Sequence, residues 1–191
     1  TGVQTCALPI FGRARGEISK GEASEIQSEL SELPAKIEQI LETVEPLREL
    51  TRKFKNSHSM LFLGRHVGFP IALEGALKLK ELAYMHAEGF AGGELKHGPI
   101  ALIEEGTPVV AIMPSEGSLL AEKMASNIQE VKARGARVIA IANEKSLVAE
   151  ATVLIPKSHK FLQAVLAVVP LQVIAYEDRK STRLNSSHTD I

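Results

Sequence analysis

Three charged residues with helical spacing, Glu74, Lys78 and Glu81, lie in the segment IALEGALKLKEL (71–82). On a helical wheel they fall within about 60° of one another, so they would form one narrow charged strip along a helix. The other faces of that helix are mostly apolar, which is typical of a helix buried on most sides. The strip is therefore either a surface ion-pair ladder, which is the more common case, or one wall of a functional site.

A glycine-rich segment, GFAGGELKHGP (89–99), follows this helix and contains His97. Its glycines allow the backbone to turn tightly and to approach a ligand closely, so we predict that His97 lies on a loop or at the edge of one. A glutamate partly desolvated by Leu77 and Leu82 would suit a base, and a histidine would relay a second proton. Lys78 would favour the ionised glutamate and could instead hold substrate oxygens. From the residues alone, this pattern predicts an acid/base site that acts next to a carbonyl group.

Two other segments precede predicted helices, where an anion could meet free backbone N–H groups: GRHVGFP (64–70) and PSEGS (114–118). The first matches no glycine fingerprint for nucleotides, and we interpret it mainly as a tight turn. Ser115 and Ser118 are expected to cap a helix. The six histidines show no zinc-ligand spacing, so the sequence predicts neither a metal nor another cofactor.

Short apolar runs of strand length alternate with predicted helices from Ser59 onward. The runs are apolar throughout, as strands covered on both faces must be. This alternation predicts an α/β fold in three layers, αβα, with a mainly parallel, flavodoxin-like sheet and right-handed crossovers. Ligands in such sheets bind beyond the carboxyl ends of the strands. The expected strands are 60–64, 108–113, 137–142 and 152–156, and the expected helices are 70–87, 117–134 and 159–176.

A helical connector is predicted over residues 17–57, before an α/β lobe at 58–176. Its apolar residues recur at steps of three and four. Pro34 and Pro46 are expected to begin new helices, because proline fits the first turn of a helix but not its interior. The connector would then contain helices at about 22–32, 34–44 and 46–56.

The two ends, 1–16 and 177–191, are expected to be non-native or disordered tails, since both resemble translated adaptor sequence. The net charge of −1 offers no basic field for nucleic acid. The apolar run 161–176 is short for a membrane span and is interrupted by Gln163 and Pro170, so a buried helix is expected. The single cysteine, Cys6, excludes an internal disulfide.

Residues 61–103, which include ALEGALKLKE and HAEGFAGGELKHGP, resemble the second sugar isomerase (SIS) lobe of the glucosamine-6-phosphate synthase family, also called glutamine–fructose-6-phosphate aminotransferases (isomerising). The resemblance continues more loosely from Glu17 to Tyr176. It implies an SIS fold and a part in converting fructose 6-phosphate and glutamine into glucosamine 6-phosphate and glutamate. A separate glutaminase domain would supply the ammonia. The resemblance also implies a cytoplasmic enzyme.

The resemblance gives roles to three residues. Glu81 resembles the glutamate that moves a proton between C1 and C2 of the sugar. His97 resembles the histidine that opens the sugar ring and that reaches the site from a neighbouring subunit, which implies a homodimer. Lys78 resembles a lysine that assists near the reacting oxygens.

Three parts of the family pattern have no counterpart in this sequence: the glutaminase domain, the first SIS lobe with its phosphate-binding Ser/Thr loop, and the C-terminal lysine that forms an imine. Lys180 does not match that lysine. The residues that would bind phosphate are therefore unknown, and we expect the chain to be inactive by itself. One alternative is a stand-alone SIS-type sugar-phosphate isomerase or deaminase, which would need its own phosphate loop. Another is a non-catalytic regulatory lobe that binds sugar phosphate, but the connector shows no basic recognition face.

Overall fold

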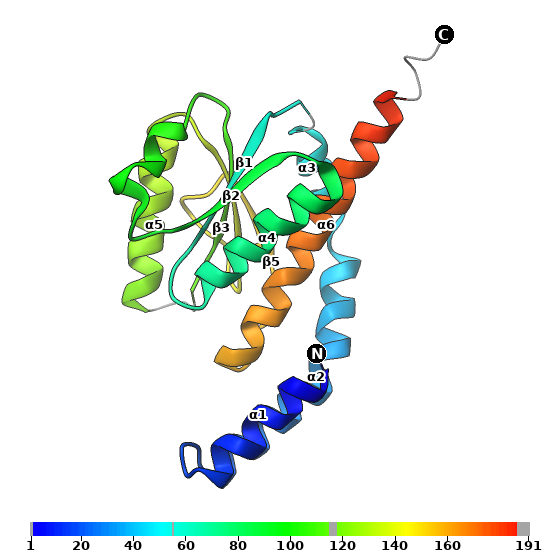
Figure 1. Ribbon diagram of the computed structural model, residues 1–191, viewed down its shortest axis with the longest axis vertical. Coiled ribbons are helices and arrows are strands. Elements are labelled where there is room, and N and C mark those ends of the chain that lie inside the picture. The colour runs from blue at the N-terminus through cyan, green and yellow to red at the C-terminus, as the bar shows by residue number, and fades with distance from the viewer. Residues whose placement is uncertain (1, 55, 115–117, 187–191) are drawn as a thin grey trace.

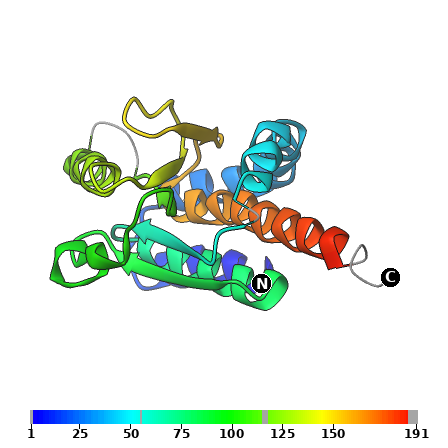
Figure 2. The ribbon, with the colours of Figure 1, turned by 90° about the horizontal axis from the view of Figure 1, so that it is seen from above.

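The computed structural model describes residues 2–54, 56–114 and 118–186, and its centre is a five-stranded sheet (Figure 1). All strand pairs are parallel, and the order is β2-β1-β3-β4-β5. Helices cover both faces of the sheet, which confirms the predicted three-layer α/β architecture (Figure 2). The strands are β1 Ser59–Gly64, β2 His86–Ala91, β3 Pro108–Ile112, β4 Arg137–Ala142 and β5 Ala151–Leu154.

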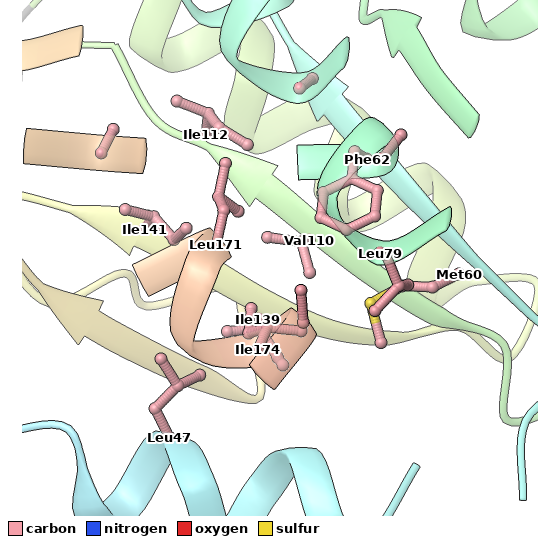
Figure 3. Packing of buried hydrophobic residues seen from close by; sticks show 14 of the residues in the cluster. Leu47, Met60, Phe62, Leu79, Val110, Ile112, Ile139, Ile141, Leu171 and Ile174 are labelled. Carbon is pink, nitrogen blue, oxygen red and sulfur yellow. The ribbon is translucent and has the colours of Figure 1, made fainter. Parts of the chain in front are cut away.

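The side chains of β1, β3 and β4 point alternately to two buried faces. One set, which includes Phe62 and Val110, packs with helices α3, α4 and α6 (Figure 3). The other set, which includes Leu61 and Val109, packs against α5. Because both faces are covered, these strands are apolar throughout, as predicted. The helices are α3 Glu45–Arg52, α4 Gly68–Ala83, α5 Leu119–Lys132 and α6 Lys160–Ser186.

Strand β2 was not predicted from the sequence. It lies at the edge of the sheet and pairs with β1 alone among the described strands. An edge strand does not need a continuous apolar run, and β2 carries His86, Glu88 and Gly89 in six residues. Its composition therefore resembled that of a loop.

Two glycines determine how closely α4 approaches its neighbours. A Cβ atom at Gly75 would lie 2.9 Å from the Leu171 side chain of α6 and 2.9 Å from the Phe62 ring. A Cβ atom at Gly89 would lie 2.8 Å from the backbone nitrogen of Leu73. Neither position has room for a side chain, so α4 packs directly on α6 and on β2.

The connector differs from its prediction at Pro34. Helix α2, Lys20–Glu42, runs without interruption through this proline, and the predicted break is wrong. Leu33 and Ile37 pack on the core and Ile40 is buried, so the apolar stripe continues on the same face across Pro34. Burial of that stripe outweighs the lost backbone hydrogen bond. Pro46 lies in the first turn of α3, as predicted.

Both segments that were predicted as tails contain helix. Helix α1, Gly2–Ala14, lies beside α2, and α6 continues beyond residue 177 as far as Ser186. Glu177 is 2% exposed and pairs with two arginines of α3, Arg48 at 3.2 Å and Arg52 at 3.4 Å. Residues 187–191 lie outside the described part of the chain.

Helix α6 is a core helix, in agreement with the predicted buried helix. Leu166, Leu171 and Ile174 are at most 1% exposed and pack with α4 and the sheet. Among the described residues, one segment, Lys160–Lys180, is long and apolar enough to cross a membrane by length and composition, and it is this same helix.

Candidate active site

The charged strip predicted on residues 71–82 is present on the outer face of α4. Lys78 lies between the two glutamates: its Nζ is 2.7 Å from Glu81 Oε2 and 3.6 Å from Glu74 Oε1. The side chain of Lys78 is 27% exposed and that of Glu81 is 50% exposed. The hydrogen bond from Lys78 to Glu81 raises the pKa of the lysine, so the ammonium group stays protonated.

The expected desolvation of Glu81 is not found in this chain. Leu77 and Leu82 are 41% and 42% exposed, so they do not cover the Glu81 carboxylate. Leu73 on the same helix and Tyr84, the residue just after the end of that helix, are also exposed, at 46% and 78%. Helix α4 therefore presents a mixed apolar and charged outer face, which we call the α4 face: Leu73, Glu74, Leu77, Lys78, Glu81 and Tyr84.

His97 lies in a short 3₁₀ turn, Leu95–His97, just after the end of β2, which agrees with its predicted place at a loop edge. Its Nδ1 atom is 2.8 Å from Oε2 of Glu94, and its side chain is 72% exposed. The next residue, Gly98, has a φ of 144°, a conformation that favours glycine.

The turn that carries His97 is fixed by its neighbours. Leu95 is fully buried beneath α5, and Lys96 Nζ is 3.0 Å from Glu130 Oε1 on that helix. The backbone nitrogen of Glu94 donates to the Ala91 carbonyl oxygen at 2.8 Å. The imidazole is therefore presented to solvent from a turn held by the core.

Within one chain, Glu81 lies near the amino ends of the parallel strands and His97 lies near their carboxyl ends. The ends of β1 and β2 pair at Gly64 and Ala91, so the turn that carries His97 follows the carboxyl edge. Helix α4 begins at this same edge with Gly68 and runs back along β1. Glu81 comes thirteen residues later, roughly 20 Å along the helix axis. The structure thus joins Lys78 to Glu81 but does not bring His97 to them.

A pocket of about 260 Å³ lies between the carboxyl ends of β1 and β3, where the strand order reverses. This is the usual ligand position in such sheets. Two of its polar side chains already have partners: Arg65 donates to Asn127 at 2.9 Å, and Gln163 accepts from Ser158 N at 2.9 Å. The rest of the wall is largely apolar, as at Ile112.

In the two segments that were considered for anion binding, the described residues form a tight turn and a helix cap, as predicted for them. In the turn 64–70, the first backbone donors of α4, on Gly68 and Phe69, are bonded to carbonyl oxygens within the turn. Ser118 caps α5 and accepts from Ala121 N at 3.2 Å. Ser115 lies outside the described residues. In the part of the chain that the structure describes, no cluster of three His, Cys, Asp or Glu residues is placed to hold a metal ion.

Sequence reasoning missed the contact between Glu94 and His97. The signal was present in GELKH, where the two residues are three positions apart. That spacing brings side chains together only in a helical turn, whereas we expected a loop. Arg65 was also missed as a link from β1 to α5 and to the Gly92 carbonyl oxygen, at 3.1 Å.

Comparisons with known proteins agree with this fold. The SIS domain family matches residues 53–177. A glutamine–fructose-6-phosphate aminotransferase [isomerizing] of Streptomyces coelicolor is 54% identical over 173 residues, and the match covers 87% of this chain and 28% of that protein. The same enzyme of Leifsonia xyli subsp. xyli is 50% identical, over 91% of this chain and 30% of its own length. This chain thus spans less than a third of these relatives.

A solved structure is also similar: the C-terminal domain of glucosamine-fructose-6-phosphate aminotransferase from Francisella tularensis. It superposes with a TM-score of 0.84 at 30% identity, and the match covers 92% of this chain and 50% of that one. The resemblance that was predicted from residues 61–103 is confirmed by the relatives and by the shared fold. Since one family accounts for the parallel sheet, the covering helices and residues 53–177, this chain belongs to the SIS domain family.

Proposed function

We propose that this chain is the second SIS lobe of an enzyme that converts fructose 6-phosphate and glutamine into glucosamine 6-phosphate and glutamate. The observation that carries the proposal is the Lys78–Glu81 pair at 2.7 Å on the open α4 face. It occurs in a chain that is 54% identical to an aminotransferase of this kind. The pair supplies a carboxylate and a fixed positive charge, the two groups that proton transfer beside a carbonyl needs.

Each residue has a role in this reaction. Glu81 takes a proton from C1 of the open-chain ketose and returns it to C2. Lys78 stabilises negative charge that develops on a substrate oxygen. His97 opens the ring: a proton leaves the hydroxyl group on the anomeric carbon, the bond to the ring oxygen breaks, and that oxygen receives a proton. No electrons are gained or lost overall.

The site is completed by parts beyond one copy of this chain. Glu81 and His97 lie at opposite ends of the parallel strands in one chain, which supports a site in which His97 is supplied by a second copy in a homodimer. The α4 face is covered by the first SIS lobe, which also supplies the phosphate-binding loop. The exposed apolar residues of the α4 face, Leu73, Leu77 and Tyr84, support its being covered by that lobe. Burial there would provide the desolvation of Glu81 that the single chain lacks.

The glutaminase domain and the imine-forming lysine belong to the remaining parts of the enzyme, which works in the cytoplasm. We therefore expect the 191-residue chain alone to form no glucosamine 6-phosphate from fructose 6-phosphate with either glutamine or ammonia.

The test places this chain in a complete enzyme, by replacing the matching segment of the Streptomyces coelicolor relative. Glu81→Gln and His97→Ala should each lower sugar isomerisation by about 10²- to 10⁴-fold, because each removes a proton-transfer group. Glutamine hydrolysis should remain measurable in both variants. Glu122→Gln and His86→Ala, at exposed positions on α5 and β2, serve as controls and should keep sugar turnover near the parent value. Unchanged sugar turnover in both Glu81→Gln and His97→Ala would refute the proposal.

A further inference from the structure

The contact between Glu94 and His97 determines which ring nitrogen of the histidine carries hydrogen. The Nδ1 atom lies 2.8 Å from Glu94 Oε2, a hydrogen-bond distance. An ionised carboxylate only accepts hydrogen bonds, so the Nδ1 atom must donate. In the neutral imidazole the hydrogen then stays on Nδ1, and Nε2 keeps its lone pair.

The backbone keeps the two side chains in this arrangement. The His97 nitrogen donates to the Glu94 carbonyl oxygen at 2.9 Å, which closes the turn between them. The buried Leu95 prevents the turn from rotating as a unit. Lys96, the nearest cation in sequence, is directed to Glu130 of α5 at 3.0 Å and so does not compete for Glu94.

The Nε2 atom of His97 is open to a substrate. The side chain is 72% exposed, and in the hydrogen bonds and ion pairs of the described residues its only contact is the one through Nδ1. A second histidine of the chain shows the opposite choice: His86 meets Glu88 through Nε2, at 3.4 Å. The His86–Glu88 contact therefore provides a comparison within the same chain for the His97–Glu94 contact.

We propose that Glu94 is a positioning residue that holds His97 in the Nδ1–H tautomer and so makes Nε2 the nitrogen that exchanges a proton with the sugar. This rests on the proposed function, in which His97 opens the sugar ring. Glu94 does not touch the substrate. It acts through the imidazole, in the way that a carboxylate orients a catalytic histidine in other enzymes.

The tautomer is measured directly by ¹⁵N NMR of the imidazole rings in the 191-residue chain, at alkaline pH where the rings are neutral. His97 should be mainly Nδ1–H in the parent chain. In Glu94→Ala it should change to mainly Nε2–H, the form that an unconstrained imidazole favours in water. Glu94→Gln should retain the Nδ1–H form, because its amide oxygen still accepts a hydrogen bond.

Glu88→Ala is the matched control and should leave the His97 tautomer unchanged. Glu94→Ser, whose side chain is too short to reach the ring, repeats the test if Glu94→Ala lowers the stability of the chain. The inference is overturned if parent His97 is mainly Nε2–H, or if removal of the Glu94 side chain leaves the tautomer ratio unchanged.

Activity of the chimeric enzyme separates this inference from the proposed function. Glu94→Ala should lower kcat for sugar isomerisation roughly tenfold with little change in KM, and Glu94→Gln should recover most of it. If His97→Ala leaves sugar turnover unchanged, the proposed function fails while the NMR result stands. If His97→Ala abolishes turnover and Glu94→Ala changes neither tautomer nor kcat, the inference alone fails.

Discussion

At the scale of single residues, the Lys78–Glu81 pair is both an ion pair and a candidate site. Its members are exposed, and exposed ion pairs contribute little to folding. The pair lies beside Leu77 and Tyr84, which are themselves open to solvent. A ladder that served only solubility would not need this apolar border, so the α4 face is better explained as a surface that becomes covered.

A buried carboxyl group gives a prediction of pH dependence. Burial raises the pKa of Asp178 from its usual value of 3.8 to about 6. The folded chain thus binds this proton more tightly than the unfolded chain, and ionisation destabilises the fold as the pH rises through about 4 to 6. Asp178→Asn should raise the free energy of unfolding by about 1–3 kcal/mol near pH 8 and have little effect near pH 4.

Urea denaturation of the parent chain and Asp178→Asn at the two pH values tests this. Glu38→Gln, at an exposed position on α2, should give no difference at either pH. A stabilising effect of Asp178→Asn that is equal at both pH values would contradict the role of ionisation.

At the scale of secondary-structure elements, the close packing of α4 against its neighbours depends on glycine residues at the points of contact. A Cβ atom at Gly75 would meet Leu171 and the Phe62 ring at 2.9 Å, and neither side chain has room to move because both are at most 1% exposed. Gly75→Ala should therefore destabilise the chain by about 1 kcal/mol, even though alanine is the better helix former.

Gly21 in α2 provides the matched comparison, since it is exposed and its nearest neighbour would be Ser19 Oγ at 3.8 Å. Gly21→Ala should stabilise the chain by up to about 1 kcal/mol, because only helix propensity changes. Thermal melts of the two variants should move in opposite directions. Stabilisation by Gly75→Ala would show that the α4–α6 contact is looser than described.

Three strands could be predicted from the sequence because both of their faces are buried. Strands β1, β3 and β4 are covered on both faces, and their continuous apolar runs indicated this. Strand β2 lies at the edge and carries Glu88 and Gly89, so its pattern was that of a loop. The path of α2 through Pro34 depends on contacts with the core, which a local rule for proline does not include.

In the candidate site, too, some contacts could be predicted from the sequence and others could not. Spacing along a helix was enough to predict that Lys78 meets Glu81, because the helix itself fixes the distance. The pairing of Glu94 with His97 depends on a 3₁₀ turn that forms when Leu95 is buried against α5. No spacing rule indicated that Glu81 and His97 lie at opposite ends of the parallel strands, because their positions follow from the path of α4 back along the sheet.

At the scale of the whole molecule, a site shared between two copies makes a sharp prediction for mixed dimers. If Glu81 of one copy works with His97 of the other, a dimer of one Glu81→Gln chain and one His97→Ala chain has one intact site and one doubly altered site. Each homodimer alone has none. Co-assembly of the two chimeric variants should therefore restore about a quarter of the parent sugar turnover, because about half of the dimers are mixed.

The measurement is fructose 6-phosphate isomerisation after the two inactive variants are co-expressed, compared with the same variants purified separately and kept apart. A chain that carries both substitutions, mixed with either single variant, should restore nothing and is the control. Absence of recovery in a confirmed mixed dimer would mean that both groups of one site come from one chain.

Gly89 lies where β2 contacts α4, the helix that carries Glu81. Its α-carbon faces the main chain of α4 at Leu73, so backbone atoms alone determine the gap between the helix that bears Glu81 and the strand that leads to His97. Glu81 and His97 of one chain are thus carried by two elements in close backbone contact, although the proposed dimer would assign them to different sites. A shift between α4 and β2 would therefore disturb both sites of the proposed dimer at once.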